Sequence, residues 1–241
     1  MGNRAKQTVL RGFGITLLSV CLSAGITSLW YEMDSNVTRG DILFVAILIP
    51  MICAPLCTYI GMKSRLKMEA LALENERIAN TDALTGLSNR RAFFDKIQAL
   101  FETPQEPAGR VTYFVCDIDH FKHFNDQHGH ATGDAVLSHV ARLIRQTLPQ
   151  RALIARIGGE EFAVRLNNRT DRSDASIFAD RLVDRVAREP LIVDGHRLAV
   201  TLSVGVFVGD ELTPPVQALK AADEAMYAAK ANGRNQYVWA A

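Results

Sequence analysis

The sequence has no excess of either charge, because 27 Lys and Arg residues face 26 Asp and Glu residues for a formal net charge of +1. A nucleic-acid-binding domain usually carries a strong basic excess, so this balance argues against a nucleic-acid partner. Cysteine is also scarce, and the four cysteines have neither the paired spacing of a zinc site nor that of a disulfide framework. We therefore expect them to be buried, unreactive thiols.

Two long runs lack charge altogether, Gly12–Trp30 and Ile42–Met62. At about 1.5 Å per helical residue, each is close to the roughly 30 Å needed to cross a bilayer. The first run could instead be a signal peptide, but it is long for one and a second run follows. Buried helices of a large core are a further alternative. The sequence predicts a membrane anchor over residues 1–61, with transmembrane helices at about 12–30 and 42–62.

The charges that flank these runs predict an orientation. Basic residues precede the first run and follow the second, whereas the segment between the runs is mainly acidic. The basic residues are Arg4, Lys6, Arg11, Lys63, Arg65 and Lys67. Both termini are therefore expected on the cytoplasmic side.

Residues 62–81 are charged and favour a helix, which predicts a linker or signalling helix. Leu66 and Leu73 are seven residues apart, as are Leu71 and Ile78. The stretch is too short to establish a coiled coil. It could pair weakly with a copy of itself, or it could be a solvated connecting helix.

Residues 82–241 alternate between helical and strand patterns, which predicts one α/β domain, an α+β sandwich with a mixed central sheet and flanking helices. The predicted helices are 88–101, 133–148, 175–188 and 215–231. The predicted strands are 111–116, 152–157, 161–166, 198–208 and 236–239.

Four carboxylates stand at predicted strand ends. Asp117 and Asp119 end the first strand, while Glu160 and Glu161 follow the Gly158-Gly159 pair in a hairpin turn. If the hairpin lies beside that strand, three or four acids converge, and a divalent cation would relieve their repulsion. Oxygen ligands favour Mg²⁺ or Mn²⁺. The alternative is a set of solvated turn acids.

Glycines and basic residues extend this pattern. The glycine pair lets a phosphorylated substrate approach the backbone closely. Lysine and arginine near a carboxylate and metal rim are typical of nucleotide phosphoryl transfer, in which catalysis is mostly positioning and charge neutralisation. The residues concerned are Lys122, Asn125, Asp134, Lys230 and Arg234.

Five motifs resemble, in order, the signatures of the GGDEF-domain diguanylate cyclases. They are DALTGLSNRRAF (82–93), DIDHFKHFND (117–126), GHATGD (129–134), RIGGEEF (156–162) and AMYAAKANGRN (225–235). The central signature takes the Gly-Gly-Glu-Glu-Phe form. The resemblance covers roughly Asp82 to Val238 and implies a fold like that of nucleotidyl cyclases and polymerase palms.

The resemblance also implies roles for individual residues. Metal would be bound by Asp117, the Ile118 carbonyl, Glu160 and Glu161. Glu160 would also be the catalytic base for the ribose 3′-hydroxyl. The triphosphate would be held by Lys122, which is also a catalytic candidate, by Lys230 and Arg234, and by backbone amides near Phe121. Asn125 and Asp134 would bind the base.

The implied reaction is the metal-dependent condensation of two GTP molecules into cyclic di-GMP and two pyrophosphates, by a homodimer at the bacterial inner membrane with its catalytic domain in the cytoplasm. Asp134 favours GTP, because its carboxylate would face an acceptor atom in adenine. A catalytically silent receptor or dimerisation module is the alternative, and a cyclase with another product is a third. The Arg-x-x-Asp product-inhibition site of many relatives is replaced here by Pro149-Gln150-Arg151-Ala152, so we expect weak or absent product inhibition.

Overall fold

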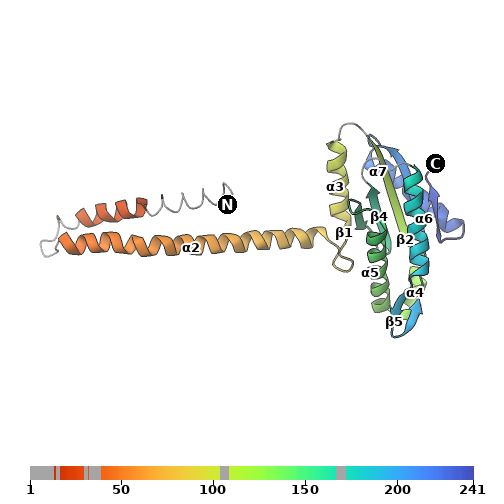
Figure 1. The fold of residues 1–241 in the computed structure, drawn as a ribbon, viewed down its shortest axis with the longest axis horizontal. Coiled ribbons are helices and arrows are strands. Elements are labelled where there is room, and N and C mark those ends of the chain that lie inside the picture. The colour runs from red at the N-terminus through yellow and green to blue at the C-terminus, as the bar shows by residue number, and fades with distance from the viewer. Residues whose placement is uncertain (1–13, 15–16, 30–31, 33–38, 104–108, 167–171) are drawn as a thin grey trace. The chain divides into compact units, whose positions relative to one another are not determined.

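The computed structural model describes residues 14, 17–29, 32, 39–103, 109–166 and 172–241. The chain divides into two compact units, Met1–Asn75 and Glu76–Ala241, and Figure 1 shows their elements. The second unit contains every predicted site residue. Each unit is described by itself.

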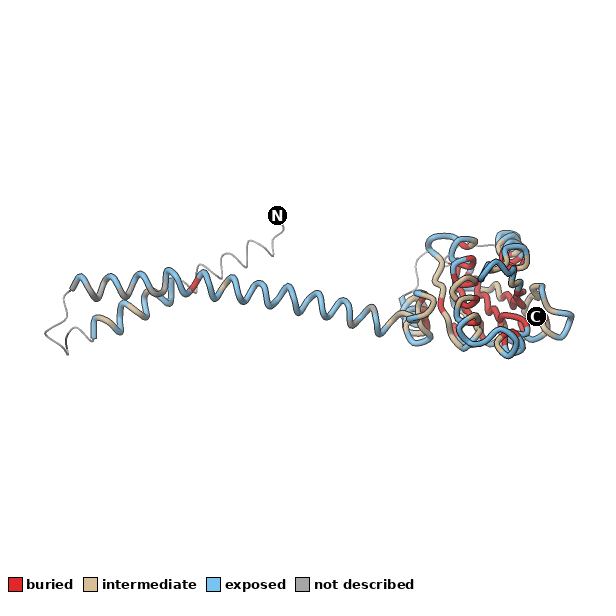
Figure 2. Tube along the Cα trace, turned by 90° about the horizontal axis from the view of Figure 1, so that it is seen from below, coloured by how far each residue is buried: buried red, intermediate tan, exposed pale blue. Residues whose placement is uncertain are grey.

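The described residues of the first unit are helical. Residues 17–29 are helical, and α2 (Arg39–Asn80) runs for 42 residues, with its described side chains almost all exposed (Figure 2). Within the described residues, no helix combines the length and the apolar character needed to cross a bilayer. The predicted spans at 12–30 and 42–62 are therefore not supported, and part of the first lies outside the described residues.

The second unit is built on a six-stranded mixed sheet with the order β1-β3-β4-β2-β7-β8. Its strands are β1 (Ser88–Asn89), β2 (Arg110–Ile118), β3 (Leu153–Arg156), β4 (Glu161–Leu166), β7 (Leu202–Asp210) and β8 (Gln236–Trp239). The helices are α3 (Arg90–Glu102), α4 (Phe121–His128), α5 (His130–Thr147), α6 (Arg172–Arg188) and α7 (Pro215–Ala231). A separate hairpin joins β5 (Leu191–Val193) to β6 (His196–Leu198).

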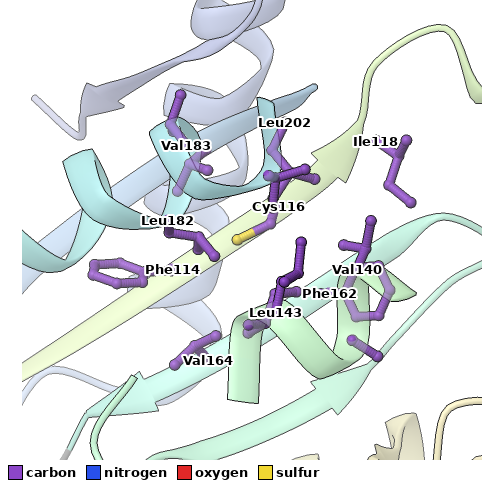
Figure 3. Close-up of a cluster of buried hydrophobic side chains, with 14 of the residues drawn as sticks. Phe114, Cys116, Ile118, Val140, Leu143, Phe162, Val164, Leu182, Val183 and Leu202 are labelled. Carbon is purple, nitrogen blue, oxygen red and sulfur yellow. The ribbon is translucent and has the colours of Figure 1, made fainter. Parts of the chain in front are cut away.

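Strand β2 shows how the layers form, because successive side chains of a strand point to opposite faces. Phe114, Cys116 and Ile118 pack into one core with α5 and α6 (Figure 3). Tyr113 and Val115 pack into a second core with α3 and α7. Helices thus cover both faces of the sheet, and the predicted α/β sandwich is confirmed.

The cysteine prediction is correct for only one residue. Cys116 is buried, and this burial raises its pKa to about 12. Cys21, Cys53 and Cys57 are exposed, because the helical segments that carry them have few neighbours among the described residues.

Most predicted elements are present, with shifted ends. Three of them, β4, α7 and β8, have the predicted bounds. The first helix begins at Arg90 rather than Ser88, because Ser88 and Asn89 pair with β3 and Asn89 caps α3 by accepting the Ala92 amide. Helix α4 and the β5–β6 hairpin, which are both short, were not predicted from the sequence.

Gly205 in β7 should be among the least replaceable residues of the fold. A Cβ placed there would overlap the Ala222 carbonyl oxygen and the Met226 amide nitrogen of α7, which are backbone atoms and cannot rotate away. We expect Gly205→Ala to destabilise the protein by about 3 kcal/mol, measured as a lower denaturant midpoint. Gly159→Ala is the control, because no atom lies within 4 Å of its added Cβ. Equal midpoints for the two variants would contradict the prediction.

Candidate active site

The fold brings the predicted metal ligands together at one end of the sheet. Asp117, near the end of β2, is the ladder partner of Glu161 at the start of β4. The Ile118 amide donates to the Glu160 carbonyl oxygen at 3.3 Å. The β3–β4 turn, which carries Gly158 and Gly159, therefore lies directly beside the end of β2.

These carboxylates occupy an environment that disfavours their ionised forms. Asp117 is only 4% exposed, and burial raises its pKa, an effect that the Lys230 ammonium opposes. Burial also raises the pKa of Glu160, and the charges of Asp117 and Glu161 add to that effect while Lys230 opposes it. The site therefore holds more negative charge than Lys230 alone can neutralise.

This deficit of positive charge fits a divalent cation. Mg²⁺ is commonly held by one or two protein carboxylates, with substrate phosphates completing its shell. Asp117, the Ile118 carbonyl and Glu160 offer such a set. Within the described part of the chain, no three His, Cys, Asp or Glu side chains are grouped to hold a metal by themselves, so the phosphates would have to contribute.

Two acids of the expected cluster have other surroundings. The Asp119 carboxylate is buried and accepts hydrogen bonds from Thr201, Ser203 and the Asn235 amide. The Glu161 side chain lies over Gly158, where an added Cβ would overlap its Oε2 atom. Three or four acids were expected to converge here. Asp119 has its own hydrogen-bond donors, from residues at the start of β7 and just before β7 and β8, although its charge still raises the pKa of Asp117.

Helix α7 brings a cation to the site from the far end of the chain. Lys230 Nζ lies 2.7 Å from Asp117 Oδ2. The helix ends one residue later, at Ala231. Gly233 follows with φ +110°, and the Arg234 amide donates back to the Ala229 carbonyl at 3.0 Å. This 6→1 bond is that of a Schellman cap. It places Arg234 four residues after Lys230 at the same helix end.

A helix N-terminus lies directly after β2, the strand that carries two of the predicted metal ligands. Helix α4 begins at Phe121, following His120 with φ +56°. The first amides of a helix have no partners inside it, and together with the helix dipole they favour anions. Phe121 and the exposed Lys122 occupy this first turn, which suits a phosphate group.

The two predicted base-binding residues are adjacent in space. Asn125 of α4 packs against Gly133 of α5, where an added Cβ would overlap Asn125 Oδ1. This oxygen is buried and has no hydrogen-bond partner among the described residues. The next residue, Asp134, is exposed. Asn125 and Asp134 together thus offer an acceptor oxygen without a partner and a nearby carboxylate.

The structure also shows contacts between the start of the domain and the glycine turn that the sequence did not predict. Arg156 Nη1 contacts the Asp82 carboxylate at 3.3 Å, while its Nη2 donates to the Gly159 carbonyl at 2.7 Å. Asp82 in turn accepts the Thr85 amide and hydroxyl. Both residues lie inside recognised motifs, but their pairing spans 74 positions and no local pattern signals it.

Comparisons with known proteins identify the family of this chain. The family model described as "Diguanylate cyclase, GGDEF domain" matches residues 79–236. The chain belongs to the GGDEF diguanylate cyclase family. Diguanylate cyclase A of Treponema denticola is 35% identical to this GGDEF protein over 176 residues, or 70% of this chain and 47% of that relative. The chain therefore spans about half of that relative's length.

Solved GGDEF domains have the same fold. The coiled coil and GGDEF domain of DgcB from Caulobacter crescentus, in complex with c-di-GMP, gives a TM-score of 0.69 at 32% identity, covering 78% of this chain and 98% of that one. The active GGEEF domain of a diguanylate cyclase from Vibrio cholerae gives 0.58 at 31% identity, covering 64% and 98%. The mixed sheet of this GGDEF domain is thus that of its family.

The crowding of carboxylates should cost stability in the absence of metal. Because the pKa of Glu160 is raised in the folded protein, its ionisation lowers the free energy of unfolding, and the full loss is present at every pH above that raised pKa. Glu160→Gln should therefore raise the thermal unfolding midpoint near neutral pH in the presence of a chelator. Below its ordinary pKa of 4.5, Glu160 is protonated in both states, so the gain should vanish there.

The control for this experiment is Asp95→Asn, an exposed carboxylate on α3, which should show no such pH-dependent gain. A Glu160→Gln variant that is less stable than the wild type at neutral pH would contradict the electrostatic account.

Proposed function

We propose that this protein condenses two GTP molecules into cyclic di-GMP and two pyrophosphates. The observation that carries the proposal is the pair formed by the buried Asp117 and the partly buried Glu160, whose raised pKa values indicate a site that favours positive charge. Lys230 contacts Asp117, and the α4 N-terminus follows the end of β2 directly. Carboxylates, a lysine and free helix amides together suit a metal-bound triphosphate.

In the proposed reaction, Glu160 accepts the proton of the 3′-hydroxyl of one GTP. The 3′-oxygen then attacks the α-phosphorus of the second GTP, and pyrophosphate leaves. A raised pKa makes Glu160 a stronger base than an ordinary carboxylate. Lys122, Lys230 and Arg234 hold the triphosphate and neutralise its charge. A Mg²⁺ or Mn²⁺ ion held by Asp117, the Ile118 carbonyl and Glu160 would supply further neutralisation, with Glu161 beside it.

The proposed preference for guanine rests on Asn125 and Asp134. Guanine presents N1–H and N2–H₂ donors on one edge, which a carboxylate and an amide oxygen can accept. The unpartnered Asn125 Oδ1 supports this role. Adenine has an acceptor at N1, so it would leave Asp134 facing a lone pair, and such mismatches are strongly rejected.

The proposed enzyme works as a homodimer. One domain offers one GTP site, and ring closure needs two GTP molecules that face each other. A helix that pairs with a copy of itself raises the effective concentration of the attached domains, and residues 62–80 of α2 are the segment proposed to do so. The dimer can be transient.

The reaction is tested by incubating the purified full chain with GTP and Mg²⁺ and following products by mass. We expect cyclic di-GMP from the wild type and at least a roughly hundredfold loss in Glu160→Ala, since a general base contributes about 10²–10⁴-fold. Asp95→Ala, an exposed acid on α3, should retain activity. A folded wild type without product at high concentration would favour the silent receptor, and equal turnover of ATP would favour another cyclase.

The proposed location is the inner membrane of a bacterium, with the catalytic domain in the cytoplasm. The uncharged runs at 12–30 and 42–62 support it, as do large apolar side chains that are exposed along this segment. These include Leu17, Leu18, Leu22, Ile26, Leu29, Phe44, Met51, Ile52, Leu56 and Ile60. Solvent contact with so many apolar groups is unfavourable.

Fractionation of cells that express the chain tests this location. We expect the full chain in the membrane pellet, resistant to alkaline carbonate and released by detergent, because lipid would cover the apolar side chains. A variant that begins at Met62 should stay in the supernatant. The full chain in the supernatant, with the protein folded, would contradict the proposed location.

A further inference from the structure

Asp119 is a buried carboxylate beside the metal-ligand strand for which the proposed reaction has no use. It follows Ile118, is 6% exposed and accepts three hydrogen bonds. Thr201 Oγ1 donates to its Oδ2 atom at 2.6 Å and Ser203 Oγ to its Oδ1 atom at 2.6 Å. The third donor is the Asn235 amide, 3.1 Å from Oδ2. A buried charge is tolerable only with such partners.

The third donor belongs to an unusual turn. Three successive residues have positive φ values, Gly233 at +110°, Arg234 at +66° and Asn235 at +45°. Residues other than glycine adopt this region at a cost, and they persist there only where the surroundings hold them. Contacts from outside the turn must therefore hold the backbone in this conformation on each side of Arg234.

Both contacts are hydrogen bonds that backbone amides of the turn donate. The Arg234 amide donates to the Ala229 carbonyl of α7, and the Asn235 amide donates to Asp119. Beyond the turn, Gln236 of β8 pairs with Ser203 of β7, and the same Ser203 donates to Asp119. The carboxylate thus joins the ends of β2, β7 and β8 at the turn that carries Arg234.

We propose that Asp119 is a positioning residue for Arg234, whose carboxylate holds the left-handed turn from which the arginine binds the triphosphate. This inference rests on the proposed function, which assigns Arg234 to the triphosphate. It gives Asp119 a role through hydrogen-bond geometry, not through charge at the metal.

Replacing Asp119 by asparagine separates the effect of its hydrogen-bond geometry from the effect of its charge. Its amide oxygen can take the place of Oδ2 and accept from Thr201 and the Asn235 amide. Its NH₂ group then faces Ser203, whose hydroxyl can accept as well as donate. Asp119→Asn keeps the support of the turn and loses the charge, whereas Asp119→Ala loses both.

The experiment measures KM for GTP and kcat of the full chain, with the pyrophosphate affinity measured by calorimetry in Mg²⁺. Loss of a charge-assisted hydrogen bond should raise KM in Asp119→Ala by about tenfold, with a much smaller change in kcat, because ground-state binding is affected. Pyrophosphate affinity should fall by a similar factor. Asp119→Asn should stay within about threefold of the wild type in each quantity.

A double-mutant cycle with Arg234→Ala gives the decisive comparison. Residues that act through one another are not additive, so Asp119→Ala should change KM by less than about twofold once Arg234 is absent. Leu182→Ala, in the α6 core away from the site, is the control for general destabilisation and should leave KM unchanged. Additive effects would overturn the proposal, as would an Asp119→Asn variant as impaired as Asp119→Ala.

The two proposals fail separately. A wild type that binds pyrophosphate with the expected dependence on Asp119, but forms no cyclic di-GMP, would contradict the reaction alone. A wild type that forms cyclic di-GMP with unchanged KM and pyrophosphate affinity in Asp119→Ala would contradict the positioning role alone.

Discussion

The active site of this domain depends on one strand, β2, that is buried on both faces and hydrogen-bonded along both edges. It pairs with β4 on one side and with β7 on the other, and helices cover both of its faces. A strand so enclosed cannot shift without disrupting two cores. Its last residues, Asp117 and Ile118, therefore have fixed positions at the margin of the apolar interior. The same burial raises the pKa of Asp117.

Every other part of the site is positioned relative to this strand end. The β3–β4 turn brings Glu160 and Glu161 through the β2–β4 ladder, and α7 brings Lys230 by packing on β7 and β2. Arg156 ties the glycine turn to Asp82 at the start of the domain. The acids are held close together despite their repulsion. Holding the acids together lowers the stability of the fold but creates a negative electrostatic potential that attracts cations. Functional sites commonly lose stability for such a reason.

The sequence predicted those elements whose signals are local. The α7 and β8 bounds agree with the prediction, since Pro215 begins a long periodic segment and Gly233 follows its end. Helix α4 was missed because it has only eight residues and His120 provides no side-chain cap. Strand β1 was read as helix because its two residues are strand-like only through pairing with β3. Propensity is overridden where a short segment meets a partner far along the chain.

By itself, the sequence determined the chemistry available to this protein: carboxylates at a strand end, a glycine pair before two glutamates, and basic residues near the far end of the chain. Only the tertiary structure decided which of these groups act together. It gave the Asp119 carboxylate three hydrogen-bond donors from distant segments, Thr201, Ser203 and the Asn235 amide. It joined Lys230 to Asp117. The physical reason is that composition and local pattern specify which groups a segment carries. The direction and partners of a buried polar side chain are set by donors and charges that folding brings from distant segments.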